Sequence, residues 1–354
     1  MKITNSFPNE IPKNWSTLSK LIKKKKNEKK IINENDLQIY ILTWNIHGKM
    51  PLKNHLEIIL PKDKNYDMYI ISTQECMRSI SASFLNDSKD EWINLLKEYF
   101  GDEYINLINE NLSAFHISVF VNFKIKNKFK NLQVSKVKTG FLNVMSNKGA
   151  VAVAMEYLNK KLCFICCHLT HGYKYIQKRN DDFKRINQEL IFTPYEDNKN
   201  IIENNNINKT DYFDIVFWTG DFNYNLNSNK DEILKMIHDK NYFKLKELDQ
   251  LTQEIKSNRI DINNFEEGEI HFFPTYKYKE ESDDYVLNNR IPSFTDRIFY
   301  KVKKINDLKL CEYNCINEIK YSDHKPVYAI FDLNYSENKS TIVYIKKEKA
   351  CCIF

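Results

Sequence analysis

Eight short apolar runs, spread between residues 37 and 333, constrain the fold of this chain more than any other feature. Each run holds about five to eight mostly β-branched or aromatic residues, which is the length and composition of a buried strand. Many of the runs end in a cluster of polar residues. This pattern is typical of a two-sheet sandwich or a layered α/β fold that brings functional side chains to one rim. The runs read QIYILTWN, MYIISTQE, SAFHISVFVNF, AVAVAMEY, KLCFICCHL, DIVFWTGDFN, SFTDRIFYKV and PVYAIFDL.

The length of 354 residues suits one large α/β domain or two small ones, and no internal repeat is visible. An Asn-rich stretch, residues 198–208, has no apolar periodicity, so we expect an exposed loop between two strands and not a domain boundary. We therefore expect a basic lead-in over residues 1–36, one folded domain over residues 37–335 and a tail over residues 336–354.

The N-terminal sequence MKITNSFPNEIPKNW lacks the apolar segment of a secretory signal, and no stretch approaches the roughly 20 apolar residues that span a bilayer. We expect a cytoplasmic protein whose eight cysteines are reduced thiols. Cys163, Cys166 and Cys167 suggest a zinc site, but they lie in a strand-like run without a second pair of cysteines, so buried core positions are favoured. The net charge of +6 favours anionic phosphates or an anionic membrane leaflet without requiring nucleic acid.

The polar residues at the ends of the apolar runs form a chemically coherent set. Carboxylate and amide oxygens suit Mg²⁺, which is usually held by one or two carboxylates together with water and phosphate oxygens. Two histidines and a further carboxylate remain for proton transfer or for stabilising a transferring phosphoryl group. The set indicates a phosphoester hydrolase, and its members are Asn45, Glu75, His168, Asp221, Asn223, Asp296, Asp323 and His324.

Six motifs contain these residues, in the order TWNIHG, TQEC, SNKGAV, FWTGDFNYNL, RIPSFTDRIF and SDHKPV. In this order they resemble the inositol polyphosphate 5-phosphatases, over about residues 41–333. The resemblance implies a four-layer α/β sandwich of the DNase-I type, in which two mixed β-sheets pack face to face with helices outside. It also implies that residues 37–335 are a catalytic domain. The expected activity is removal of the 5-phosphate from phosphatidylinositol 4,5-bisphosphate, phosphatidylinositol 3,4,5-trisphosphate or soluble inositol polyphosphates.

The same resemblance assigns roles to individual residues. Glu75 would be the main Mg²⁺ ligand, with Asn45 and Asp323 on the metal side of the site. Asp221 would orient or deprotonate the attacking water and Asn223 would position that water or a phosphate oxygen, without a covalent phospho-enzyme. His324 would stabilise charge on the phosphoryl group, Asp296 would orient His324, and His168 would contact phosphate or handle a proton.

The residues expected to grip the inositol phosphate are Asn147, Lys148, Tyr276, Lys277 and Arg290, which resemble the substrate-binding positions of the family. Several positions depart from the family pattern, and two of them concern positions where a basic residue is usual. Asn288 stands where many members have a lysine, and Asn225 stands where an arginine is usual. These departures concern recognition of the inositol ring. Which other phosphates the preferred substrate carries besides the 5-phosphate is therefore left open.

The last four residues, Cys351-Cys352-Ile353-Phe354, fit a C-a-a-X box in which Cys351 would be prenylated. Lys346, Lys347 and Lys349 lie just upstream and supply the basic patch that stable anchoring needs beside a single lipid. We therefore expect peripheral attachment to the cytosolic leaflet. The alternative is a tail with two chance cysteines.

Other functions use a similar set of residues. A Mg²⁺-dependent nuclease or a sphingomyelinase of the same superfamily would share the Asn, Glu, Asp and His positions, but FFPTYKYK and RIPSFTDRI argue against both. From a different class, the chain could be an inactive phosphoinositide-binding module, although each proposed catalytic position holds a competent residue. We expect a monomer with no nucleic-acid partner.

Overall fold

The computed structural model describes residues 33–76, 87–140, 142, 145, 147–193, 208–262, 264–286 and 290–335, with only the backbone of residues 87–90. Most of the lead-in, most of the Asn-rich stretch, Asn288 and the tail with Cys351 lie outside these residues. The compact unit that holds both sheets begins at Leu37. Among the described residues, no helix has the length and apolar character needed to cross a membrane.

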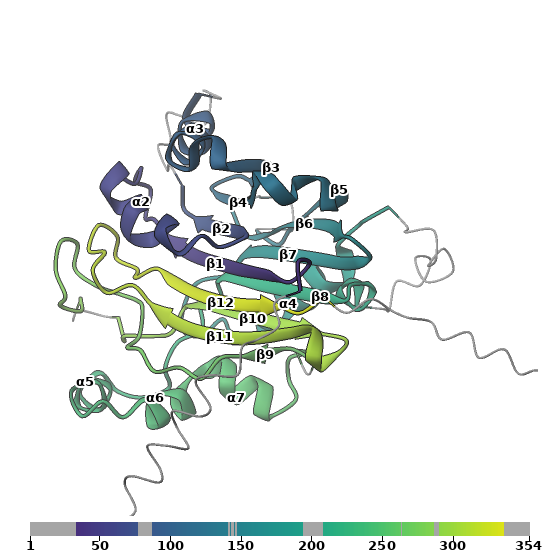
Figure 1. The fold of residues 1–354 in the computed structure, drawn as a ribbon. Helices are drawn as coiled ribbons and strands as arrows, with labels where there is room; N and C mark the ends of the chain where they lie inside the picture. The colour runs from purple at the N-terminus through teal and green to yellow at the C-terminus, as the bar shows by residue number, and fades with distance from the viewer. Residues whose placement is uncertain are drawn as a thin grey trace, which may run out of the picture. The chain divides into compact units, whose positions relative to one another are not determined.

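Two six-stranded sheets form the centre of this unit, in the orders β11-β12-β1-β2-β4-β3 and β5-β6-β7-β8-β10-β9 (Figure 1). β1 runs parallel to β2 and β7 runs parallel to β8, whereas the other neighbouring pairs are antiparallel. Both sheets are therefore mixed. The strands are β1 Leu37–Asn45, β2 Met68–Gln74, β3 Tyr104–Leu112, β4 Phe115–Asn122, β5 Phe129–Lys138, β6 Gly149–Tyr157, β7 Lys160–His168, β8 Ile215–Asp221, β9 Glu266–Glu267, β10 Asp296–Val302, β11 Leu308–Cys315 and β12 Val327–Leu333.

Helices cover the outer faces of the two sheets (Figure 1). α2 (Lys53–Ile59) and α3 (Asp87–Phe100) pack their apolar side chains on the outer face of the first sheet. α4 (Ile176–Glu189) and α7 (Gln250–Lys256) cover the second sheet, where the ring of Phe183 stacks on Trp218 at 4.0 Å. The other helices in the described part of the chain are α5 Lys230–His238 and α6 Tyr242–Leu248, with 3₁₀ turns at Lys62–Lys64, Gly101–Glu103, Phe123–Lys128, Lys209–Tyr212 and Ile305–Asp307. The expected four-layer sandwich is confirmed.

The facing sides of the sheets enclose the main hydrophobic core. Ile41 and Ile70 of the first sheet and Phe164 and Phe217 of the second are buried in one cluster. The rings of Phe164 and Phe217 stack at 5.4 Å, and Phe217 meets Phe331 of β12 edge-on at 4.9 Å. The two sheets therefore pack directly on each other. As a result, strand ends of both sheets lie at one rim.

The three cysteines of the KLCFICCHL run are buried free thiols in β7. Cys166 faces the other sheet, whereas Cys163 and Cys167 face the helices on the outer side. The alternation follows from the two-residue period of a strand, which points successive side chains to opposite faces. The expectation of core cysteines is confirmed.

All eight predicted apolar runs are strands, but β3, β5, β9 and β11 were not predicted. These four strands lie at the edges of the sheets. Many of their side chains are only half-buried or exposed, as in YINLINENL of β3 and LKLCEYNC of β11. A strand without a buried face lacks the apolar signal by which a sequence indicates it.

The rim of the sandwich collects strand ends from both sheets. β1 and β2 are parallel and finish side by side at Asn45 and Gln74. β7 and β8 are also parallel and finish side by side at His168 and Asp221. β10 is antiparallel to β8 and begins at Asp296, opposite Asp221. Polar residues that are far apart in the sequence are thereby placed at one edge.

Candidate active site

A cavity of about 190 Å³ opens at this rim. Most of the predicted site residues line it, and they come from both sheets and from the loops that follow the strands. Those that line it are Asn45, Glu75, Lys148, His168, Asp221, Asn223, Tyr276, Lys277, Arg290, Asp323 and His324.

Asp221 lies at the centre of the cavity wall, as the last residue of β8. The preceding Gly220 has a φ of +142°, and a Cβ at that position would lie 2.0 Å from the carbonyl oxygen of Cys167. Only glycine allows β8 to approach β7 this closely. The Asp221 carboxylate accepts hydrogen bonds from Asn45 Nδ2 at 3.1 Å and from the backbone N–H of Asn223 at 3.0 Å.

The charge of Asp221 is stabilised by its neighbours. Burial alone would raise the pKa of its carboxyl group, but His168, whose Nε2 lies 3.4 Å from Oδ2, and the more distant His324 and Lys148 together hold that pKa below its usual range. Asp221 is therefore an ionised hydrogen-bond acceptor directed into the cavity.

His168 forms the neighbouring part of the wall at the end of β7. Its Nε2 contacts Lys148 Nζ, which comes from the turn before β6. Burial and the adjacent ammonium group of Lys148 both lower the pKa of His168. The carboxylates of Asp221 and Glu75 act on the pKa of His168 in the opposite direction, and the contact with His168 fixes the position of a buried lysine at the cavity wall.

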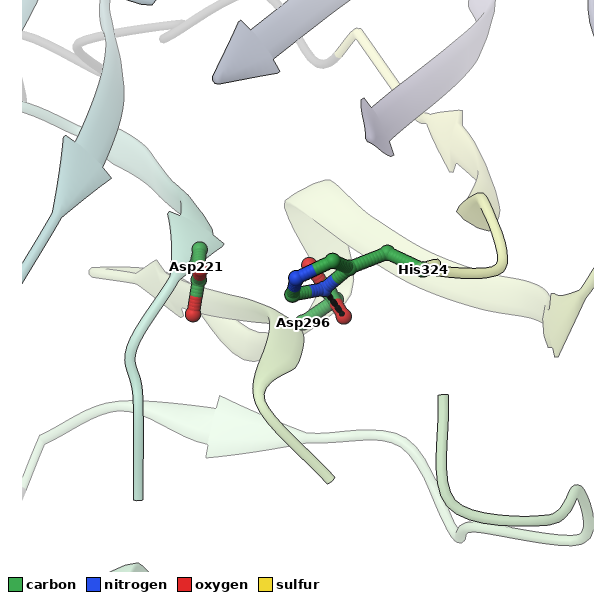
Figure 2. A group of neighbouring side chains, drawn as sticks. All are labelled: Asp221, Asp296 and His324. Carbon is green, nitrogen blue, oxygen red and sulfur yellow. Dashed lines mark hydrogen bonds and ion pairs between the residues drawn. The ribbon is translucent and has the colours of Figure 1, made fainter. Parts of the chain in front are cut away.

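His324 and Asp296 form a hydrogen-bonded pair on the opposite wall (Figure 2), with 2.8 Å between His324 Nδ1 and Asp296 Oδ2. The hydroxyls of Thr275 and Thr295 donate to the same carboxylate oxygen at 2.7 and 2.9 Å. Burial would lower the pKa of His324, but the carboxylates of Asp296, Asp323 and Asp221 together raise it to about 10. His324 is thus an oriented cation. The orienting role predicted for Asp296 matches this contact, although Asp296 itself lies behind His324 and not in the cavity lining.

Glu75 and Asn45 supply oxygen atoms on the side of the first sheet. Glu75 follows β2 with a φ of +55°, a left-handed conformation that is strained for a residue with a side chain. Asn45 ends β1, and its Oδ1 accepts the backbone N–H of His47 at 3.1 Å. These donors and the carboxylates of Asp221 and Asp323 form a hard-oxygen set that fits a divalent cation such as Mg²⁺.

Asp323 connects the metal side of the cavity to the predicted substrate-binding segment. Its Oδ2 accepts a hydrogen bond from Lys277 Nζ at 2.7 Å. Burial opposes ionisation of Asp323, but His324, Lys277 and His47 lower its pKa. The ring of Tyr276 packs on His324 with 4.3 Å between ring centroids. Lys277 and Tyr276 therefore each contact a residue predicted to act on the metal or the phosphoryl group.

Asn147 differs from the other predicted substrate-binding residues. It is exposed and does not line the cavity, although the adjacent Lys148 does. Its assignment to substrate binding stays a prediction that the position of the side chain does not support.

Five further residues line the cavity, and none of them was predicted as a catalytic, metal-binding or substrate-binding residue. These are His47, His171, Gly172, Asn225 and Thr295. His47 stands two residues after Asn45 within the TWNIHG motif, so its proximity to a predicted ligand was a usable signal. Thr295 adjoins Asp296, but no feature of the sequence distinguishes it from an ordinary strand threonine.

Three comparisons place the chain among known proteins. Residues 42–330 match the model of a family described as Endonuclease/Exonuclease/phosphatase family 2. Phosphatidylinositol polyphosphate 5-phosphatase type IV of Mus musculus is 30% identical over 317 residues, which cover 87% of this chain and 47% of that protein. A phosphatidylinositol 4,5-bisphosphate 5-phosphatase of Saccharomyces cerevisiae is 31% identical over 313 residues, which cover 84% of this chain and 31% of that protein. The chain thus spans less than half the length of these curated relatives.

Similar solved structures were also found. The inositol polyphosphate 5-phosphatase domain of SPsynaptojanin, in complex with inositol (1,4)-bisphosphate and calcium ion, aligns with a TM-score of 0.71 and 27% identity over 90% of both chains. A Cimex nitrophorin in its ferrous NO complex has a TM-score of 0.68 at 20% identity over 86% of this chain and 100% of that one, which shows a common fold alone. The resemblance indicated by the six motifs is confirmed, and the chain belongs to the endonuclease/exonuclease/phosphatase family 2, with inositol polyphosphate 5-phosphatases among its relatives.

Proposed function

We propose that this chain is a Mg²⁺-dependent phosphatase that removes the 5-phosphate from phosphoinositides or soluble inositol polyphosphates. One observation carries the proposal. A single cavity combines an oxygen-rich side around Glu75, an ionised Asp221, an oriented His324–Asp296 pair and the cationic side chains of Lys148, Lys277 and Arg290. The names of the relatives support the choice of substrate class.

Different residues would have different roles in an in-line attack by water. Asp221 accepts a hydrogen bond from the attacking water and orients it, with Asn45 Nδ2 and the N–H of Asn223 holding the carboxylate in place. Its low pKa makes Asp221 a weak base, which favours orientation of the water over full deprotonation in the ground state. The divalent cation, held by Glu75 and Asn45 with Asp323 nearby, would neutralise charge on the scissile phosphate.

His324 acts on the phosphoryl group from the other wall. Asp296 holds its Nδ1, so the Nε2–H of the imidazolium is left to donate to a phosphoryl oxygen as negative charge develops. Lys148 and Arg290 line the same space and supply further positive charge. Such preorganised donors lower the barrier because they need no rearrangement during the reaction.

Activity assays test the proposal directly. We expect phosphate release from inositol 1,4,5-trisphosphate, phosphatidylinositol 4,5-bisphosphate or phosphatidylinositol 3,4,5-trisphosphate with Mg²⁺, and its loss with a chelator. Asp221→Asn and His324→Ala should each lower kcat by about 10²-fold or more while the circular dichroism spectrum stays unchanged. Activity that persists in the presence of chelator, or a wild-type kcat in Asp221→Asn, would contradict the mechanism.

We further propose that prenylation of Cys351 places the protein on the cytosolic leaflet of a membrane, supported by the C-a-a-X pattern and the neighbouring lysines. On this proposal the tail, from about residue 337, holds the rim with the cavity near that leaflet. Cys351→Ser should move the protein to the soluble fraction. The same distribution for wild type and variant would contradict prenyl anchoring.

A further inference from the structure

Two loops lie side by side along one wall of the cavity. One follows β7 and contributes His171 and Gly172 to the lining, and the other follows β8 and contributes Asn223 and Asn225. Asn223 Nδ2 donates to the carbonyl oxygen of Leu169 at 3.1 Å, which joins the loops close to the strand ends. The shape of this wall therefore depends on how the two loops are held against each other.

Gln250, the first residue of α7, contacts both loops. It is fully buried. Its Nε2 donates to the carbonyl oxygen of Tyr173 at 3.3 Å and to Asn227 Oδ1 at 2.9 Å. Its Oε1 accepts the backbone N–H of Asn225 at 3.0 Å and an N–H of Arg179 at 2.8 Å. An amide has two donor hydrogens and two acceptor lone pairs, so all four hydrogen-bonding positions of Gln250 are filled.

The partners of this amide determine its orientation. The backbone N–H of Asn225 and the guanidinium of Arg179 can only donate, whereas the carbonyl oxygen of Tyr173 can only accept. Glutamate has nearly the same shape as glutamine, but it would place an acceptor oxygen opposite the Tyr173 carbonyl. The contacts between the two loops therefore require an amide at position 250.

Arg179 extends the same network from α4 to the residues on both sides of His171. It is fully buried, and its Nη1 donates to the carbonyl oxygens of Thr170 at 3.3 Å and Gly172 at 2.7 Å. Asp182 of α4 accepts from the backbone N–H and the hydroxyl of Thr170 at 3.0 and 2.6 Å. His171 therefore lies between two residues that are both anchored to α4.

The network is separate from the groups that would act on the reacting phosphoryl group. The hydrogen-bond partners of Gln250 named above do not include Asp221 or His324. His171 and Asn225 nevertheless line the same cavity as those two residues. They would therefore face the part of the substrate that does not react, which is the inositol ring with its other phosphates.

We propose that Gln250 is a positioning residue for substrate recognition, which holds His171 and Asn225 against the inositol ring and the phosphates that are not removed. The inference rests on the proposed phosphatase function and deepens it. An imidazole and an amide can both donate hydrogen bonds to phosphate oxygens or ring hydroxyls, so both residues determine specificity. A change at Gln250 therefore affects substrate binding more than the chemical step.

Steady-state kinetics of Gln250→Glu test the inference, with Mg²⁺ and the inositol phosphate or phosphoinositide that wild type hydrolyses fastest. We expect KM to rise at least about 10-fold while kcat changes less than about threefold, because the loops shift and the reacting groups do not. Gln177→Glu is the control, since it adds the same charge to an exposed side chain of α4 outside the cavity lining. It should change KM by less than about twofold.

A double-mutant cycle separates positioning from a general loss of structure. His171→Ala combined with Asn225→Ala should raise KM about 10-fold. Adding Gln250→Glu to this pair should raise KM less than about twofold further, because the side chains that Gln250 positions are already absent. If Gln250→Glu does not fold, Tyr173→Phe replaces it in the cycle. This variant removes only the half-exposed hydroxyl that donates to Asn227 Oδ1 at 3.0 Å, and it should raise KM about threefold.

Three results would overturn the inference and leave the proposed phosphatase intact. These are an unchanged KM in the variant used, a kcat that falls as much as kcat/KM, and full additivity in the cycle. Failure of wild type to release phosphate from any of these substrates would overturn both.

Discussion

At the residue scale, three residues of the cavity adopt left-handed backbone conformations although none is glycine. His47, Glu75 and Asn223 have φ values of 52°, 55° and 57°, and each follows the end of a strand within two residues. Such conformations cost about 1–3 kcal/mol each and cluster at functional sites. The turns they form direct three polar side chains into one space, which regular strand geometry would not do.

Asp296→Asn tests the link between the Asp296 carboxylate and the charge on His324. The carboxylates of Asp296, Asp323 and Asp221 raise the pKa of His324 to about 10 from an ordinary value of 6.5, and Asp296 contributes most among them. Because the pKa of His324 is raised, the imidazolium stays protonated up to a higher pH. Removing the Asp296 carboxylate should therefore lower the upper pH limit of activity. We expect kcat at pH 8 to fall by about 10²- to 10⁴-fold, and the alkaline limb of the pH–rate profile to move several units toward neutrality.

Asp239→Asn is the control for this prediction, because Asp239 is a half-exposed aspartate that neighbours the exposed His238 outside the cavity. It should leave the profile unchanged. An alkaline limb in Asp296→Asn that coincides with that of wild type would show that Asp296 does not maintain the charge of His324.

Most of the site residues that were predicted from the sequence have a side chain in the cavity lining, whereas two threonines that were not predicted act through another residue. The motif residues Asp221 and His324 were predicted because their chemical type and their motif both point to catalysis. Thr275 and Thr295 were not predicted, since their role lies in donating hydrogen bonds to Asp296, and a threonine hydroxyl has many ordinary uses. Asn147 was predicted from the resemblance to the family, but its side chain is exposed, and of the described residues in the turn before β6 it is Lys148 that lines the cavity.

At the scale of elements, a buried ionic cluster joins β10 to the helices beside the second sheet. Arg297 of β10 bonds Asp249 at 2.9 Å and Glu267 of β9 through two nitrogens. Asp249 also caps α7, accepting the N–H of Thr252 at 3.0 Å, and Lys246 of α6 contacts Glu267. The cluster therefore connects β9, β10, α6 and α7, and β10 begins at Asp296, which holds His324.

Arg297→Met should destabilise the fold by about 3–5 kcal/mol, because removal of one member leaves two buried carboxylates without their main counter-charge. Urea unfolding measures the change. Lys53→Met is the control, since Lys53 pairs with Glu98 at the surface and exposed pairs contribute about 0–1 kcal/mol. Equal midpoints for the two variants would contradict the role assigned to Arg297.

Strands could be predicted from the sequence where they are buried, because a buried strand appears as a run of apolar residues. Central strands such as β2 and β8 are buried along their whole length and produce continuous apolar runs. The edge strands β3 and β11 carry polar residues on both faces, so their pairing with β4 and β12 depends on long-range contacts that a local pattern does not contain.

At the scale of the whole domain, the two sheets are held together by aromatic and aliphatic side chains that interdigitate across their facing sides. The layered fold was predictable because strand-like runs alternated with helical stretches and the motifs occurred in family order. The order in which the strands pair within each sheet was not predictable, because no local sequence signal determines which buried strands lie side by side.

Phe164→Ala tests the contribution of this core. Phe164 is 1% exposed and stacks on Phe217, so truncation removes a large buried ring and leaves a cavity between the sheets. We expect a loss of about 3–5 kcal/mol in the free energy of unfolding, measured with denaturant. Phe243→Ala, at a side chain that is 74% exposed, should change it by less than about 0.5 kcal/mol. A similar effect of the two substitutions would refute the assignment of Phe164 to the core.

The hydrogen bond from Asn45 to Asp221 joins the end of a strand in the first sheet to the end of a strand in the second. Distances within the cavity consequently depend on the spacing between two separate layers. A substitution between the sheets can displace one layer against the other and alter turnover from a distance. Tolerance of the core to mutation should therefore form a gradient, lowest beside the rim and rising toward the opposite end of the sandwich.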